Sequence, residues 1–255
     1  MRERDGYAII EWKSVRVERD PGGEGEKNAM REGKGTMRAF LWAQGALYAL
    51  FVSMDLLNMG RAGDPVKFCS ILLCLAFCLF WAGRGGDRLV ATAMAFTLCA
   101  DFFLLALDRD YALGVGIFCA VQGLYLLRLC REMGRRPMLL LRAVLVMMGL
   151  TGLLWLKIFT PLNVLAAFYF ANFLGNVLLA AKVPGLRGRL FFVGLALFLC
   201  CDICVGMHNV PQIVPRWGLE AARVGMWLFY LPGQVLIALS ALPDSELRGF
   251  DHARK

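Results

Sequence analysis

Eight apolar stretches divide most of the chain into segments of similar length. Each holds roughly 17–21 residues with few charges, which is about the length that an α-helix needs to cross the hydrocarbon core of a bilayer. Because backbone N–H and C=O groups find no water in that core, each stretch is predicted to be a helix rather than a strand. The predicted spans are 39–59, 67–83, 88–107, 111–127, 138–156, 161–181, 189–206 and 223–242.

Turn-forming residues separate several of these spans, with Gly and Pro beside charged residues at 60–65, 83–87, 134–137 and 184–185. The first 37 residues are polar and show no apolar period, which is typical of disorder. The pattern therefore predicts an all-α fold, a polytopic transmembrane bundle over residues 38–243. A disordered cytoplasmic tail is expected over residues 1–37, and a cytoplasmic C-terminal tail over residues 244–255.

Composition and charge support this interpretation and add an orientation. Hydrophobic residues make up 58% of the chain, which has a net charge of +8. The basic residues cluster in short loops rather than in a stripe with aromatics, so no nucleic-acid partner is expected. One predicted face holds only Arg61, Lys67, Arg109, Lys157, Arg216 and Arg223, and Arg142 lies inside a span. The remaining 21 of the 28 Lys and Arg residues mark the cytoplasmic face, which places both termini there in a multi-pass cell-membrane protein.

Metal and cofactor chemistry is not indicated. The chain has nine cysteines, nearly all in apolar runs, where a thiol behaves as a small hydrophobe. The CxxC of Cys201 and Cys204 lies within a predicted helix and has no second pair. Only two histidines are present, and no phosphate-binding or dinucleotide-binding motif occurs. We therefore expect no metal and no cofactor, and any acid–base chemistry falls to carboxylates.

Three carboxylates lie inside predicted spans, where an ionisable group costs several kcal/mol and marks a candidate functional site. Asp101 and Asp202 lie at similar depth in spans that run in the same direction, and Asp55 lies closer to the outer surface. All three are expected in the outer half of the bundle, where they can face one cavity. Asp101 and Asp202 are the predicted catalytic pair.

Neutral polar residues extend this candidate site. The pairs Gln122 and Tyr125, and Tyr230 and Gln234, are each co-facial on a helix, and Asn172 and Asn176 share a face with Tyr169. The alternative is that such groups only join helices by hydrogen bonds. The predicted binding residues are Lys67, Gln122, Tyr125, Asn172, Tyr230, Gln234 and Asp55.

An internal similarity links the two halves of the chain. Leu98-Cys-Ala-Asp101 in the third span resembles Leu199-Cys-Cys-Asp202 in the seventh, and the span that follows each carries a glutamine. This is compatible with a parallel repeat of four spans and four spans, an arrangement that some membrane proteins show.

The same residues resemble those of the YhhN-like lysoplasmalogenase family. The segment Gly114-x3-Phe118-x3-Gln122-x2-Tyr125, which follows Asp101, is similar to that family's pattern of Gly, Phe, His and Tyr. Lys67 resembles the Lys at the start of an early family helix, Asp202 falls where the family has Ser-Asp, and Tyr230 and Gln234 match its last helix. The resemblance covers residues 65–240. Four positions depart from the family pattern: Gln122 replaces His, Ala100 replaces Gly, Cys201 replaces Ser and Phe68 replaces Pro.

The resemblance implies eight spans and hydrolysis of the vinyl ether bond of a lysoplasmalogen. It thereby implies a membrane lysophospholipid substrate, a fatty aldehyde and a glycerophospho-headgroup as products, and Asp101 and Asp202 as paired acid and base. Lys67 would meet the lipid phosphate as a point charge. Two alternatives stay open: a proton-coupled transporter of small solutes, since paired acids also form proton relays, and a non-catalytic lipid-binding protein. The sequence makes no prediction of an oligomeric state.

Overall fold

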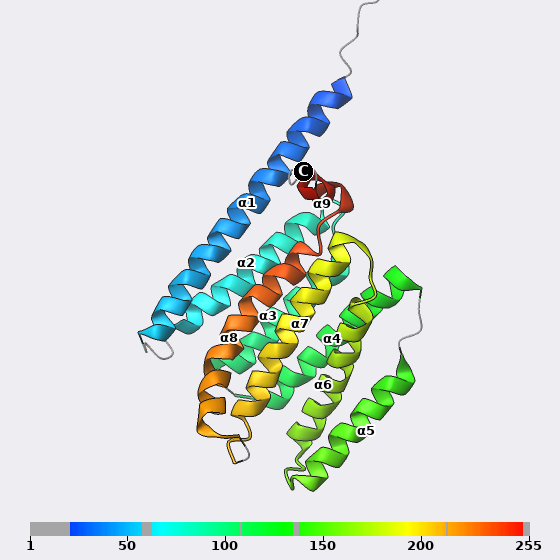
Figure 1. Cartoon of the computed structure of the whole chain (residues 1–255). Coiled ribbons are helices and arrows are strands. Elements are labelled where there is room, and N and C mark those ends of the chain that lie inside the picture. The colour runs from blue at the N-terminus through cyan, green and yellow to red at the C-terminus, as the bar shows by residue number, and fades with distance from the viewer. Residues whose placement is uncertain (1–20, 58–62, 108, 135–137, 213, 252–255) are drawn as a thin grey trace, which may run out of the picture.

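The fold is a bundle of antiparallel helices, described here from a computed structural model that covers residues 21–57, 63–107, 109–134, 138–212 and 214–251 (Figure 1). The described residues form helices and turns and no strand. The elements are α1 (Pro21–Leu56), α2 (Asp64–Ala82), α3 (Arg88–Asp101), η2 (Phe102–Leu107), α4 (Tyr111–Met133), α5 (Leu139–Trp155), α6 (Pro161–Ala180), α7 (Gly185–His208), α8 (Arg216–Leu239) and α9 (Asp244–Asp251).

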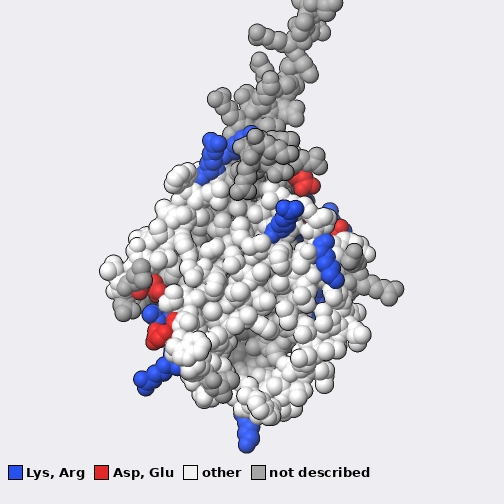
Figure 2. All heavy atoms as spheres, viewed as in Figure 1, with Lys and Arg blue, Asp and Glu red and all other residues white. Residues whose placement is uncertain are grey.

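Each predicted span corresponds to one helix, except that 88–107 corresponds to α3 followed by η2, which confirms the polytopic bundle. Within the described residues, six helices are long and apolar enough to cross a membrane, and α5 is a shorter apolar helix of 17 residues. Large apolar side chains such as Leu79, Leu127 and Leu140 lie on the outside of the bundle. Charged side chains gather towards the two ends of the helices and leave a broad uncharged band between them (Figure 2). This surface is what a lipid bilayer requires.

Local sequence explains where several helices begin and end. The side chain of Asp87 accepts from the backbone N–H of Leu89 and caps α3, and Thr160 caps α6 in the same way through the N–H of Asn163. Gly134 ends α4 in the left-handed conformation, at a φ of 57°, that glycine adopts without steric cost. These caps fix the helix ends, so that the polar residues within each helix face a defined side.

Proline inside α8 has a visible consequence. Pro232 has no N–H to donate to the carbonyl of Leu228, one turn earlier. The Tyr48 hydroxyl of α1 donates to that carbonyl at 3.4 Å. A hydrogen bond between helices thus replaces one that the proline removes, and it joins α1 to α8.

The helix packing follows a pattern that a parallel 4+4 repeat would give. In the first half, α1 packs on α2, α2 on α3 and α3 on α4; in the second, α5 packs on α6, α6 on α7 and α7 on α8. The contact of α2 with α8 likewise corresponds to that of α6 with α4. Helices α1 and α5 accordingly lie on opposite flanks (Figure 1). Asp101 on α3 and Asp202 on α7 occupy corresponding helices in this arrangement.

The predicted disordered tail is shorter than expected, because α1 extends back to Pro21. Within that extension, Met37 is buried, and Gly33 lies where any side chain would meet Trp81 and the carboxylate of Glu246. The described part of residues 1–37 is therefore helical, and at Gly33 it lies against Trp81 of α2 and Glu246 of α9. Residues 1–20 lie outside the described residues.

The bundle has two distinct ends. Helix α9 lies beside the first half of α1, at Gly33, so both mark the same end, which we call the α9 end (Figure 1). The opposite end, where α1 finishes and α6 and α8 begin, is called the far end.

We predict that the α9 end faces the cytoplasm, because that end receives most of the basic residues. A reporter fused after Lys255 is expected to read cytoplasmic, and a reporter inserted at 209–212 in the far-end loop is expected to read external. An external signal from the C-terminal fusion would contradict the prediction. The insertion at 209–212 serves as the internal control, since it must read opposite to the fusion.

Candidate functional site

The first acidic side chain lies at a change in helix geometry. Asp101 is the last residue of α3, and the chain continues directly into the π-helical turn η2. Its side chain is buried, and its Oδ2 accepts a hydrogen bond of 2.6 Å from the hydroxyl of Tyr230 on α8. Wider π-helical turns are rare and occur often at functional sites.

The glycine of the family motif makes room for this turn. A Cβ on Gly114 of α4 would lie 2.5 Å from Leu104 of η2, so a side chain there would displace η2. Because η2 follows Asp101 without a break, the position of this carboxylate depends on that close approach. The other motif residues, Phe118, Gln122 and Tyr125, are buried on the same face of α4.

The second acidic side chain has a matching partner. Asp202 of α7 is half-buried, and its Oδ2 accepts a hydrogen bond of 2.5 Å from the hydroxyl of Tyr169 on α6. Both carboxylates are thus held by a phenol from another helix. Among the described residues, no hydrogen bond is made to the Oδ1 of either carboxylate, so one oxygen of each is available for other chemistry.

An aromatic cluster joins the two Asp–Tyr pairs. The ring of Phe198 lies 5.3 Å from that of Tyr230 and 4.9 Å from that of Phe173, and Phe173 lies 5.8 Å from Tyr169. Phe118 bridges the same rings from α4, at 6.0 Å from Tyr169 and 5.7 Å from Phe198. The structure therefore brings Asp101 and Asp202 into one region of the bundle.

Contacts between aromatic rings connect Lys67 to this region. Its side chain is buried and pairs with Asp64 at 3.0 Å, and its ammonium lies 4.0 Å from the centre of the Trp227 ring and 5.0 Å from that of Phe51. The Trp227 ring in turn lies 5.8 Å from that of Tyr230. The Asp64 carboxylate compensates the Lys67 charge, and the aromatic faces add cation–π stabilisation to this ion pair.

The amides of α4 and α6 form a second polar group beside the pair. Asn176 donates to both the Oε1 and the backbone carbonyl of Gln122, at 2.8 and 2.9 Å. Arg142 of α5 donates to the Oδ1 of Asn176 at 2.8 Å and to the backbone carbonyl of Asn172 at 2.7 Å. Asn172, a predicted binding residue, thus contacts the Arg142 guanidinium, and the amides join α4, α5 and α6.

Several buried polar atoms near the acids have no hydrogen-bond partner among the described residues. They are Thr97 Oγ1, Gln122 Nε2, Tyr125 Oη and both amide atoms of Gln234. Thr97 lies one helical turn from Asp101, and Gln234 lies one turn from Tyr230. Buried polar atoms without partners cost about 1–3 kcal/mol each. The side chains of Thr97 and Tyr125 adjoin each other, as do those of Gln122 and Tyr169, which leaves the buried amide of Gln234 as the group that a bound water or another polar ligand would satisfy.

Asp55 pairs with an arginine and not with the tyrosines that hold the two other acids. Its Oδ1 lies 3.8 Å from the guanidinium of Arg223 on α8, so it forms an ion pair between α1 and α8.

Tyr169, the partner of Asp202, is not among the predicted binding residues. Its position on the face of Asn172 and Asn176 was the available signal. Within the described residues, no group of three or more His, Cys, Asp or Glu side chains is placed to hold a metal ion.

These features define a multi-pass helical membrane protein with two tyrosine-bonded carboxylates inside its bundle. The sequence profile of the YhhN family matches residues 65–241, which include all of the helices that carry these groups. The chain therefore belongs to the YhhN family. No curated protein and no solved structure matches the chain significantly.

Proposed function

We propose that this protein is a membrane hydrolase that cleaves the vinyl ether bond of a lysoplasmalogen. The observation that carries the proposal is the pair of carboxylates, Asp101 and Asp202, each held by a phenol and each left with one oxygen that has no bonding partner among the described residues. The chain's membership of the YhhN family, which it resembles in its lysoplasmalogenase motifs, is consistent with this proposal.

The chemistry needs two carboxyl groups in different protonation states. One, as the acid, transfers its proton to the vinyl carbon that is not bonded to oxygen, which leaves an oxocarbenium-like carbon beside the ether oxygen. The other, as the carboxylate, stabilises that positive charge and accepts a proton from the attacking water. The resulting hemiacetal then breaks its bond to the glycerol oxygen, which takes the proton now held by the second carboxyl group, while the hemiacetal hydroxyl gives its proton to the first and becomes the aldehyde carbonyl. One water is consumed, and an aldehyde and a glycerophospho-headgroup are released.

The remaining residues supply substrate contacts. Lys67, close to Tyr230 through Trp227, offers a positive charge to the lipid phosphate. Gln234 and Tyr125 offer buried donors and acceptors to the glycerol part of the substrate. Gln122 stands where the family has His, so that no imidazole is available on α4 and proton transfer falls to the two carboxylates.

A lysolipid must reach this site from the bilayer. Figure 2 shows the surface hollowed over the far-end parts of α6 and α7, the two helices that the Asp202–Tyr169 hydrogen bond joins. Asp202 is also the less buried of the two acids. We expect the apolar chain of the substrate to enter between α6 and α7.

A proton-coupled transporter is the second candidate, and one observation favours it. Gln122, Tyr125 and Arg128 are all buried along one face of α4, which runs from the acids towards the α9 end. A column of polar groups in a membrane protein can relay protons. This function would need access from both ends of the bundle, whereas lipid hydrolysis needs access from one side.

The deciding experiment is an assay of purified protein in detergent with three matched lysophosphatidylethanolamines that carry a 1-alkenyl, a 1-alkyl or a 1-acyl chain. We expect free fatty aldehyde, detected by mass spectrometry, from the alkenyl lipid and no cleavage of the other two, because only a vinyl ether can be protonated at carbon. Absence of aldehyde, together with proton-driven uptake of a solute in sealed liposomes, would contradict the hydrolase and support the transporter.

A further inference from the structure

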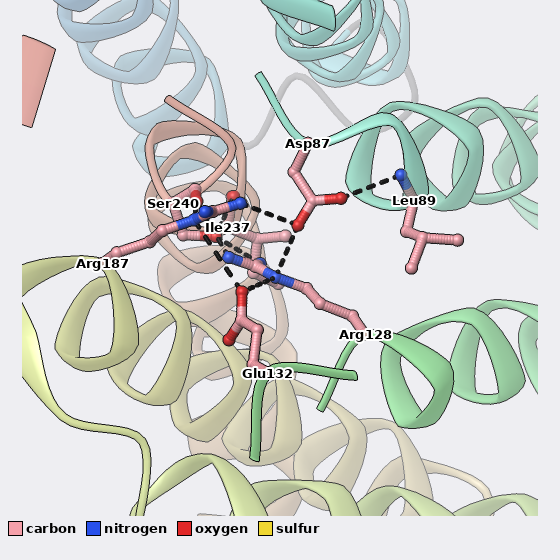
Figure 3. Close-up of polar contacts among 7 residues, drawn as sticks. All are labelled: Asp87, Leu89, Arg128, Glu132, Arg187, Ile237 and Ser240. Atoms are coloured by element: carbon pink, nitrogen blue, oxygen red, sulfur yellow. Dashed lines mark hydrogen bonds and ion pairs between the residues drawn. The ribbon is translucent and has the colours of Figure 1, made fainter. Parts of the chain in front are cut away.

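An ionic cluster at the α9 end lies away from the candidate site. It consists of Asp87, Arg128, Glu132, Arg187 and Ser240 (Figure 3). Arg128 is almost fully buried and donates to the hydroxyl and carbonyl oxygens of Ser240 at 2.8 and 2.9 Å. The guanidiniums of Arg128 and Arg187 each contact the Oδ2 of Asp87 at 2.9 Å. Asp87 is thus held at the distance expected of a charge-assisted hydrogen bond.

Glu132 is held much less closely by the same arginines. Its Oε1 lies 3.2 Å from the Nε of Arg128 and 3.8 Å from the Nε of Arg187. Charge-assisted bonds between these groups are ordinarily about 2.7–2.9 Å long. The Glu132 carboxylate is also more exposed than that of Asp87, at 22% against 9%. The Nε of Arg187 instead donates to the carbonyl of Ser240 at 3.0 Å, so Glu132 holds one long hydrogen bond, to Arg128, beside two positive charges that it compensates incompletely.

A polar hollow of about 460 Å³ opens at this point of the surface. Its lining includes Arg88 and Arg131, which are both exposed, and in the part of the chain that the structure describes neither forms an ion pair. Four arginines and two carboxylates line the hollow, which leaves an excess of two positive charges. The N-terminus of α3, at Arg88, also lies in the lining and adds the positive end of a helix dipole.

We propose that this hollow binds a phosphate group, which occupies the position between Arg128 and Arg187 now taken by Glu132. The Glu132 side chain, in the last turn of α4, moves outwards, and Arg88 and Arg131 close on the anion from the solvent side. The phosphate is either free in solution or part of an anionic lipid headgroup, since basic hollows at the membrane surface suit both.

Binding at this position has a structural consequence. Asp87 precedes α3, Arg128 lies on α4, Arg187 on α7, and Ser240 follows α8. These four helices carry Asp101, Gln122, Asp202 and Tyr230 of the candidate site. An anion that binds only the folded bundle at this junction stabilises the protein, and the stabilisation grows with the logarithm of its concentration once the concentration exceeds the Kd.

The experiment compares the melting temperature of purified full-length variants with and without a phosphate source, at constant ionic strength. One arm adds inorganic phosphate to lipid-free micelles; the other compares nanodiscs of phosphatidylcholine with nanodiscs that contain phosphatidylglycerol. We expect the melting temperature of the wild type to rise in at least one arm. A rise only in the first identifies free phosphate, and a rise only in the second identifies a lipid headgroup.

Two variants test the residues. Glu132→Gln removes the competing carboxylate, so the rise that the wild type shows is expected at a concentration about tenfold lower. Arg88→Gln with Arg131→Gln is expected to raise that concentration at least about tenfold. The matched control is Lys182→Gln with Arg189→Gln, which removes two exposed charges that do not line the hollow.

Three results would overturn the proposal. One is a wild type whose melting temperature responds in neither arm. Another is a response that the control pair weakens as much as the hollow pair does, because the effect would then come from overall charge. The third is a Glu132→Gln variant that responds at the same concentration as the wild type.

Discussion

Asp101→Asn and Asp202→Asn are each expected to lower the rate of aldehyde release by a factor of roughly 100 to 10,000, the usual contribution of a general acid or base. Asparagine keeps the size of the side chain and can still accept the tyrosine hydrogen bond, so the local packing remains. It cannot exchange a proton with the substrate or carry negative charge. The measurement is release of aldehyde from the alkenyl lysolipid by the purified variants.

The double variant distinguishes a cooperating pair from two independent groups. If the two carboxylates act in one reaction, the double variant is no slower than the slower single variant, because residues that act as a unit are not additive. Asp110→Asn is the matched control, since Asp110 is exposed and pairs only weakly with Arg109, at 3.6 Å. Near-normal aldehyde release by either single variant of the pair would contradict the mechanism.

The spans could be predicted from the sequence because the bilayer sets their length and excludes charges from their surfaces. The predicted span 88–107, for example, corresponds to α3 with η2, and 161–181 to α6. The change of helix type after Asp101 could not be predicted, because the apolar residues Phe102–Leu107 suit either geometry. Close contact with the neighbouring Gly114, which lies seven residues beyond this turn, accompanies the change.

The start of α1 was predicted wrongly for a related reason. Residues 21–37 are polar and contain several glycines, which favours disorder when the segment is considered alone. Gly33, however, allows α1 to lie close to Trp81 and Glu246, and Met37 is buried in the same packing. These contacts at Gly33 and Met37 favour the helix over the local preference, and they are not visible in the sequence of α1.

The candidate site shows the same limit at the level of single residues. Spacing along a helix correctly placed Gln122 and Tyr125 on one buried face, as well as Tyr230 and Gln234. It could not indicate which helix each face meets. The partners of the two acids, Tyr230 on α8 and Tyr169 on α6, follow from helix packing, and so does the contact between Asn172 and Arg142.

The crossing of α7 and α8 is the place where a small change is expected to destabilise the bundle most. A Cβ on Gly194 would lie 2.9 Å from the backbone oxygen of Gly233 and 2.8 Å from Ile237. A Cβ on Gly233 would lie 3.0 Å from the backbone oxygen of Gly194 and 3.1 Å from the backbone nitrogen of Phe198. Because backbone atoms cannot move aside as a side chain can, the two helices must separate to admit any larger residue.

Gly194→Leu and Gly233→Leu are therefore each expected to lower the free energy of unfolding by at least about 1–3 kcal/mol, the usual cost of overpacking. Gly206→Leu is the matched control, since a Cβ on this residue of α7 would meet no described atom of another helix within 4 Å, and it should leave stability nearly unchanged. Thermal unfolding in detergent, followed by the loss of monodisperse protein, measures the difference. Separation of α7 from α8 also moves Asp202 relative to Tyr230, so aldehyde release should fall with stability. Equal melting temperatures for Gly194→Leu and Gly206→Leu would show that the crossing tolerates a side chain and that the close approach of α7 and α8 is not required for the fold.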